Sequence, residues 1–78
     1  MKEGHKVQLT YYEYINRFVD YDADDPISRL ANRIHSDNAF PKRSKDFEEI
    51  STYLESSSKY SKLLVIFDES WQNYQYEN

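Results

Sequence analysis

The sequence predicts a small all-α domain built from four helices. Apolar side chains recur at positions i, i+3, i+4 and i+7 in successive segments, which is the spacing of one helix face. Signals typical of helix starts precede these segments, and apart from residues 63–67 no stretch alternates as a strand would. The chain has 78 residues, which is enough for one domain only, and its eight Tyr, four Phe and one Trp can supply a core.

The first helix is expected to begin after Thr10. Residues 1–8 contain the only glycine and show no periodicity, so we expect a flexible lead before a single domain over residues 9–76. Thr10 and Glu13 have the spacing of a capping box, in which each side chain accepts a hydrogen bond from the other residue's backbone N–H. A helix reaching about residue 19 is then predicted by the apolar stripe of Tyr11, Tyr14, Ile15 and Phe18.

The second helix has the clearest start signal in the chain. Asp25 is the expected N-cap, and Pro26 occupies the first helical position, where a missing N–H costs nothing. We expect this helix to end near Ser36 and to be followed by a connector over residues 37–43, in which Phe40 turns inward. Its buried stripe is predicted to be Ile27, Leu30, Ala31 and Ile34.

The third and fourth helices are separated by a run of serines. Ser44 is the expected cap of the third helix, and acidic residues in its opening turns complement the helix dipole. The fourth helix is expected to begin between Ser58 and Ser61, both of which are plausible caps. The predicted core positions are Phe47, Ile50, Tyr53 and Leu54 in the third helix, and Tyr60, Leu64, Phe67, Trp71 and Tyr74 in the fourth.

Composition excludes several classes of function. The chain has no cysteine, so disulfides, thiolate metal sites and thiol catalysis are excluded. The longest apolar run, residues 63–67, is far shorter than the roughly twenty residues of a membrane span, so we expect a cytoplasmic protein without membrane contact. The predicted domain also lacks the glycines of a phosphate-binding loop, and we expect no nucleotide or other cofactor and no small-molecule substrate.

Two possible catalytic or metal-binding patterns fail on inspection. Asp20, Asp22 and Asp24 occupy positions 1, 3 and 5 of an EF-hand loop, but position 6 is aspartate instead of glycine and position 12 is alanine instead of glutamate. His35 and Asp37 could form an acid–base pair, yet no nucleophile pattern accompanies them, and a surface histidine at a helix end is the favoured interpretation. We therefore expect a solvated acidic loop, no metal site and no enzymatic activity.

The charge distribution gives the functional hypothesis. The net charge is −4, but residues 26–45 carry five basic side chains and one acidic side chain. Arg29 and Arg33, four residues apart, lie on one side of the second helix, which leads into the basic connector. A solvated helix face, a protein-docking surface and a nucleic-acid site all remain open for the candidate basic face, which comprises Arg29, Arg33, Lys42, Arg43 and Lys45.

The chain resembles the YozE-like family of short bacterial proteins over about residues 10–76. The matching segments are Tyr11-Tyr12-Glu13-Tyr14, Asp25-Pro26-Ile27-Ser28-Arg29-Leu30-Ala31-Asn32, Phe40-Pro41-Lys42 with Ser44 and Asp46, Glu49-Ile50-Ser51, and Phe67-Asp68-Glu69-Ser70-Trp71. The resemblance implies a four-helix SAM-like bundle and carries over no activity, cofactor or catalytic residue. Our leading hypothesis is a non-enzymatic module that associates with a protein partner, or weakly with itself, through the basic face; nucleic-acid binding by the same face is the alternative.

Overall fold

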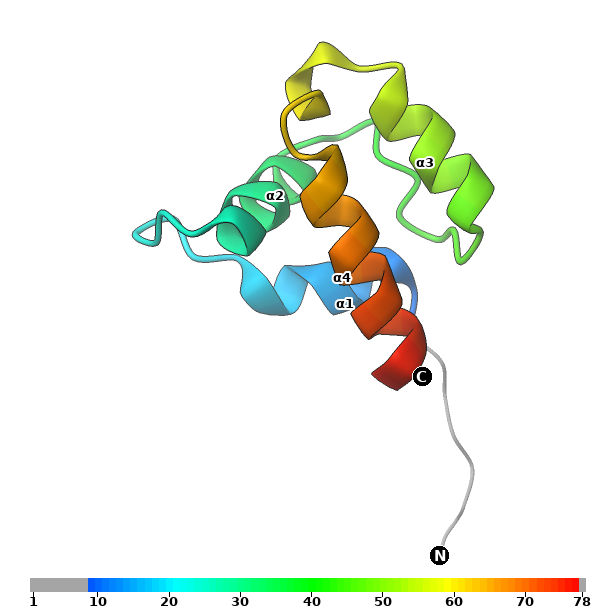
Figure 1. Ribbon diagram of the computed structural model, residues 1–78, viewed down its shortest axis with the longest axis horizontal. Coiled ribbons are helices and arrows are strands. Elements are labelled where there is room, and N and C mark those ends of the chain that lie inside the picture. The colour runs from blue at the N-terminus through cyan, green and yellow to red at the C-terminus, as the bar shows by residue number, and fades with distance from the viewer. Residues whose placement is uncertain (1–8, 78) are drawn as a thin grey trace, which may run out of the picture.

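The computed structural model describes residues 9–77, and within them it contains helices and no strand. The predicted all-α class with four α-helices is confirmed; two short 3₁₀ helices accompany them (Figure 1). The predicted lead over residues 1–8 lies outside the described residues. The elements follow one another as α1 (Tyr11–Ile15), η1 (Asn16–Phe18), α2 (Pro26–His35), α3 (Phe47–Glu55), η2 (Ser58–Tyr60) and α4 (Leu64–Glu77).

Helix α4 forms the centre of the bundle. It packs against α1, α2 and α3, and Figure 1 shows it running between α2 on one side and α3 on the other, with α1 across its C-terminal half. The core is largely aromatic: the Trp71 ring lies 5.4 Å from the Tyr11 ring and 4.9 Å from the Tyr74 ring. Phe40 is buried beside Tyr11, as predicted for the connector, so the 37–46 segment closes one end of the core.

The start signals of the first two α-helices act as predicted. Thr10 Oγ1 accepts from the Glu13 N–H at 3.2 Å, and Glu13 Oε1 accepts from the Thr10 N–H at 2.9 Å. Helix α2 begins at Pro26 with Asp25 as its N-cap and ends at His35. The first helix differs from the prediction, because α-helical geometry ends at Ile15 and the chain tightens into η1 before Val19 becomes extended.

The starts of α3 and α4 were predicted wrongly. Ser44 does not cap α3: its Oγ accepts from the Asp46 N–H, and Asp46 is the N-cap. Phe47 is 38% exposed, although its ring stacks on Phe67 at 5.6 Å between centroids. The segment from Ser58 to Tyr60 forms a separate 3₁₀ turn, and α4 begins only at Leu64.

Candidate functional site

A pocket of about 590 Å³ lies between α2 and the segment that runs from η2 into α4. Four of its lining side chains are cationic and none is acidic, although the whole chain has more acidic than basic residues. We call this site the basic pocket, and its lining residues are Arg29, Asn32, Arg33, Ser58, Lys59, Ser61, Lys62 and Leu63.

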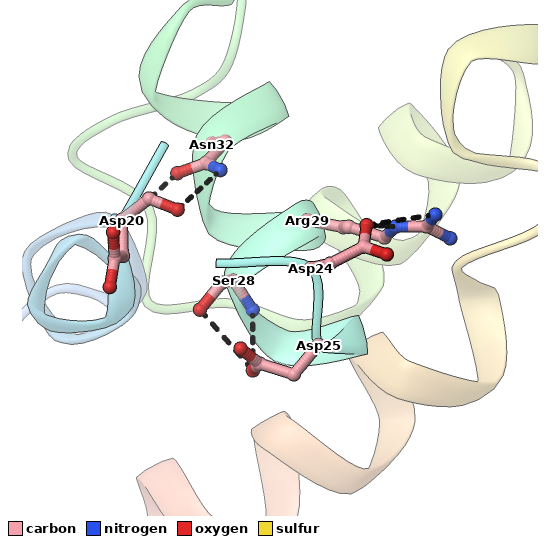
Figure 2. Close-up of polar contacts among 6 residues, drawn as sticks. All are labelled: Asp20, Asp24, Asp25, Ser28, Arg29 and Asn32. Carbon is pink, nitrogen blue, oxygen red and sulfur yellow. Dashed lines mark hydrogen bonds and ion pairs between the residues drawn. The ribbon is translucent and has the colours of Figure 1, made fainter. Parts of the chain in front are cut away.

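The α2 wall is built from the cap of the helix. The Asp25 carboxylate accepts from the backbone N–H of Ser28 at 3.3 Å and from its hydroxyl at 3.2 Å, which fixes the first turn. Arg29 and Arg33 follow one turn apart, so both side chains extend from the same side of the helix into the pocket lining. Figure 2 shows the Asp25 carboxylate against Ser28, with Arg29 following in the next turn of α2.

The acidic loop is tied to the same helix. The Asp20 N–H donates to Asn32 Oδ1 at 3.0 Å, and Asn32 Nδ2 donates back to the Asp20 carbonyl at 3.1 Å (Figure 2). Farther along the loop, Asp24 Oδ1 accepts from Nε of Arg29 and forms an ion pair with Nη2, both at 3.1 Å. The side chains of this pair are 60% exposed for Arg29 and 89% exposed for Asp24, so the ion pair is highly solvated and contributes little to stability.

The opposite wall is held in place by a buried carboxylate. Asp37, immediately after α2, is 5% exposed and accepts from the Tyr60 hydroxyl at 2.8 Å and the Tyr53 hydroxyl at 2.5 Å. The Ala39 N–H donates to the other carboxylate oxygen at 3.0 Å. Tyr60 is fully buried, and its neighbours Lys59 and Ser61 line the pocket. The link from Asp37 to Tyr60 therefore joins the two walls.

These contacts shift the acidities of the three groups. Burial by itself raises the pKa of the Asp37 carboxyl, but the hydrogen bonds from the two tyrosines and from the Ala39 N–H, together with the positive charge of Lys59, leave that pKa below its ordinary value. Burial, together with the hydrogen bond to the carboxylate, raises the pKa of Tyr53 to about 12. The same causes raise the pKa of Tyr60. Near neutral pH the cluster thus consists of an ionised carboxylate and two neutral phenols.

The basic pocket contains two of the five residues of the predicted basic face, Arg29 and Arg33. Lys42 lies elsewhere: its Nζ is 5.5 Å from the centre of the Tyr12 ring and donates to a backbone carbonyl of the connector. Arg43 and Lys45 are exposed on the connector and do not line the pocket. The turn after Phe40 separates these three residues from the pocket lining.

The two lysines of the pocket, Lys59 and Lys62, were not among the residues predicted for the basic face. They lie in an acidic half of the chain, so a count of charge by segment hides them. Their spacing of three residues, within a serine-rich segment that precedes a long helix, was the available signal. They belong to the site because the chain returns toward α2 at η2, so that Lys59 and Arg33 line the same pocket.

The other candidates from the sequence have structural partners. His35 does not meet Asp37; its Nδ1 lies 3.0 Å from Asn16 Oδ1. Asp20 Oδ1 accepts from the backbone N–H of Asp22, and Asp24 pairs with an arginine. Within residues 9–77, no three His, Cys, Asp or Glu side chains are grouped as a metal site would require.

A second pocket, of about 360 Å³, lies between the first two helical segments and α4. Its lining is largely aromatic and aliphatic and includes no basic residue: Tyr14, Phe18, Pro26, Ile27, Ile66, Glu69, Ser70 and Asn73. Of these two pockets, only the basic pocket has the positive charge that attracts an anionic ligand.

Comparison with known proteins identifies the fold family. The family model described as the YozE SAM-like fold matches residues 10–76. The chain belongs to the YozE SAM-like family. A UPF0346 protein of Geobacillus thermodenitrificans is 41% identical over 71 residues, which cover 91% of this chain and 99% of the relative. The UPF0346 protein YuiB of Lactococcus lactis is 44% identical over 66 residues, which cover 85% of this chain and 96% of the relative.

Membership of the YozE SAM-like family confirms the predicted SAM-like fold, and the relatives' names state no activity. No solved structure matches the chain. Among the described residues, no helix is both long enough and apolar enough to cross a membrane.

Proposed function

We propose that the protein is a non-enzymatic interaction module that binds an acidic segment of a partner protein through the basic pocket. The observation that carries this proposal is the concentration of charge: four basic side chains line one pocket of a chain whose net charge is −4. A recess lined by one sign of charge focuses its electric field and attracts ligands of the opposite sign.

The cations of the pocket are poorly neutralised by the protein itself. Arg29 pairs with Asp24 at the rim, whereas Arg33, Lys59 and Lys62 form no ion pair with any residue in the described part of the chain. Like charges that line one recess repel one another, and an anion that enters the pocket relieves this repulsion. An acidic partner supplies that anion.

Two features favour a protein partner over nucleic acid. Asn32, the pocket residue suited to reading a base edge, uses its amide oxygen and nitrogen in bonds to the Asp20 backbone. The net negative charge also repels a long polyanion, whose affinity depends on contacts with many phosphates. A short acidic segment contacts only the pocket, where the local charge is positive, and is attracted there.

The test is a binding titration with a short glutamate-rich peptide and, separately, a short oligothymidylate, followed by NMR chemical shifts of the backbone amides. We expect the peptide to shift amides around residues 29–33 and 58–63, and the charge-reversed pair Arg33→Glu/Lys62→Glu to abolish the effect. The matched control is Arg43→Glu/Lys45→Glu, which changes the net charge by the same amount outside the pocket and should retain binding.

Equal loss of binding in both charge-reversed proteins would contradict the proposal, because it would make the attraction a property of total charge. Tighter binding of the oligothymidylate, lost only in the pocket variant, would favour the nucleic-acid alternative instead.

A further inference from the structure

We propose that the basic pocket recognises a phosphate monoester carried on a side chain of the partner, such as phosphoserine. This inference rests on the proposed function and adds the chemical group that the pocket binds. It follows from how the pocket's charge, hydrogen-bond donors and shape compare with the two kinds of anionic side chain that a protein can offer.

The density of positive charge in the pocket favours a phosphate over a carboxylate. The pocket holds four cations within one recess, and no carboxylate lines it. A phosphate monoester carries a charge of about −1.5 to −2 at neutral pH, whereas a carboxylate carries a single charge. Because the rest of the chain is acidic, a ligand gains attraction only where it touches the pocket, and a compact dianion gains most from that small area.

The hydrogen-bond donors of the pocket also favour a phosphate over a carboxylate. Arg29 and Arg33 present two planar guanidinium groups from successive turns of α2, and such groups pair with phosphate through two parallel hydrogen bonds. Lys59 and Lys62 add point charges from the opposite wall. Ser58 and Ser61 also line the pocket. A phosphate group offers three acceptor oxygens to these donors, and a carboxylate offers two.

The acid that is ion-paired with a cation of the pocket is easily displaced. Asp24 neutralises Arg29 through a single oxygen, and its side chain is 89% exposed. Exposed ion pairs of this kind are weak and exchange readily with solvent ions. An incoming phosphate can therefore replace Asp24 on Arg29 without disturbing the buried contacts that hold the pocket walls, because those contacts involve Asp37 and Tyr60.

The size of the pocket is consistent with a single phosphate group and not with a polymer that carries many phosphates. Its volume of about 590 Å³ falls within the range of small-ligand sites, about 300–1,000 Å³. The recess can hold one phosphorylated side chain with part of its flanking backbone. It offers no continuous basic track along which a polyanion could extend, since Lys42, Arg43 and Lys45 do not line it.

The experiment compares three peptides with identical glycine flanks that carry phosphoserine, glutamate or serine at the centre. Dissociation constants are measured by NMR titration of the full chain. We expect the phosphoserine peptide to bind at least about ten-fold more tightly than the glutamate peptide, because it brings an additional charge and a further charge-assisted hydrogen bond. The serine peptide should show no saturable binding.

The same titration is repeated on the two charge-reversed proteins, after circular dichroism has shown that both are folded. Arg33→Glu/Lys62→Glu should abolish binding of the phosphoserine peptide, and Arg43→Glu/Lys45→Glu should leave its dissociation constant within about two-fold of the parent's. This pattern would place the phosphate in the basic pocket. Equal weakening by both variants would overturn the assignment to the pocket.

Glutamate and phosphoserine peptides of equal affinity would overturn the phosphate inference and leave the proposed function standing. Failure of both acidic peptides to bind would overturn the inference and the proposed function together. The inference would also be overturned if an oligothymidylate competed with the phosphoserine peptide for the pocket and bound more tightly than that peptide. The pocket would then favour a phosphodiester polymer.

Discussion

Replacing Asp37 by alanine should lower the free energy of unfolding by about 2–4 kcal/mol, although the residue contributes nothing to the apolar core. The fully buried Tyr60 hydroxyl would lose its 2.8 Å bond to the carboxylate and retain only a long contact of 3.5 Å with the Arg33 carbonyl. A buried hydroxyl without a partner costs about 1–3 kcal/mol. The Ala39 N–H would lose its acceptor as well, whereas Tyr53 is only partly buried and can bond to water.

The cost of this substitution should depend on pH with a defined sign. The pKa of the Asp37 carboxyl is lower in the folded protein than its ordinary value of about 4. Its ionised form therefore stabilises the fold fully above about pH 4, and this stabilisation is lost as the pH falls through the lowered folded-state pKa. The difference in stability between the parent and Asp37→Ala should shrink accordingly in acid.

Urea denaturation followed by tryptophan fluorescence, from about pH 7 down to about pH 2.5, measures this difference. Asp22→Ala is the matched control, because it removes an exposed carboxylate of the same type and should change stability by less than about 0.5 kcal/mol. If Asp37→Ala unfolds at the same urea concentration as the parent at neutral pH, the reasoning about the buried network is refuted. A large difference that does not change with pH would refute the part that concerns the carboxylate's charge.

Further predictions concern the core, a cap, the rim of the pocket and the acidic loop. Trp71→Ala should cost about 3–5 kcal/mol in thermal or urea unfolding, because it removes a buried ring from the aromatic core; a change of a few tenths would refute this. Thr10→Ala should cost about 1 kcal/mol through loss of the capping box, and Thr10→Ser should recover most of it. Asp24→Asn should tighten phosphoserine-peptide binding by up to about five-fold, whereas Asp22→Asn, with the same charge change and no ion pair in the described part of the chain, should tighten it less. Millimolar calcium should leave the melting temperature unchanged; a shift of several degrees that magnesium does not reproduce would contradict our interpretation of residues 20–25.

The parts of the fold that sequence predicted correctly depend on neighbours within a few positions. The capping box uses residues three apart, and the Asp25–Pro26 start of α2 likewise acts on the next turn. The inward turn of Phe40 was also predictable, because an apolar ring before a proline in a short polar connector has few alternatives to burial. In each case the interaction that forms the structure is made by residues close together in the sequence, so it can be predicted from the sequence alone.

The errors occurred where two local signals competed, and in the segment before α4 a distant contact contributed as well. Ser44 and Asp46 are both good caps, and Asp46 begins α3 while Ser44 stabilises the turn before it. Between Ser58 and Leu64 the chain buries both Tyr60 and Leu63: Tyr60 ends the 3₁₀ helix η2, and Leu63 lies in the turn after it, where its N–H donates to the Tyr60 carbonyl at 2.8 Å. The phenol bond to Asp37, across 23 positions, fixes that turn, and no periodicity reports it.

The same distant contact helps to explain why only the α2 side of the basic pocket could be predicted from the sequence. Arg29 and Arg33 belong to one helix, so their side-by-side placement follows from helical spacing alone. Their cationic partners come from a segment that the hydrogen bond from Tyr60 to Asp37 ties to the end of α2, so the pocket depends in part on a buried carboxylate that does not line it. The negative charge of the Asp37 carboxylate also acts on Lys59, which offsets part of the repulsion among the cations that line the pocket. The cost of assembling the cations is thus reduced from inside the fold, and the solvent side of the pocket remains open to an anionic ligand.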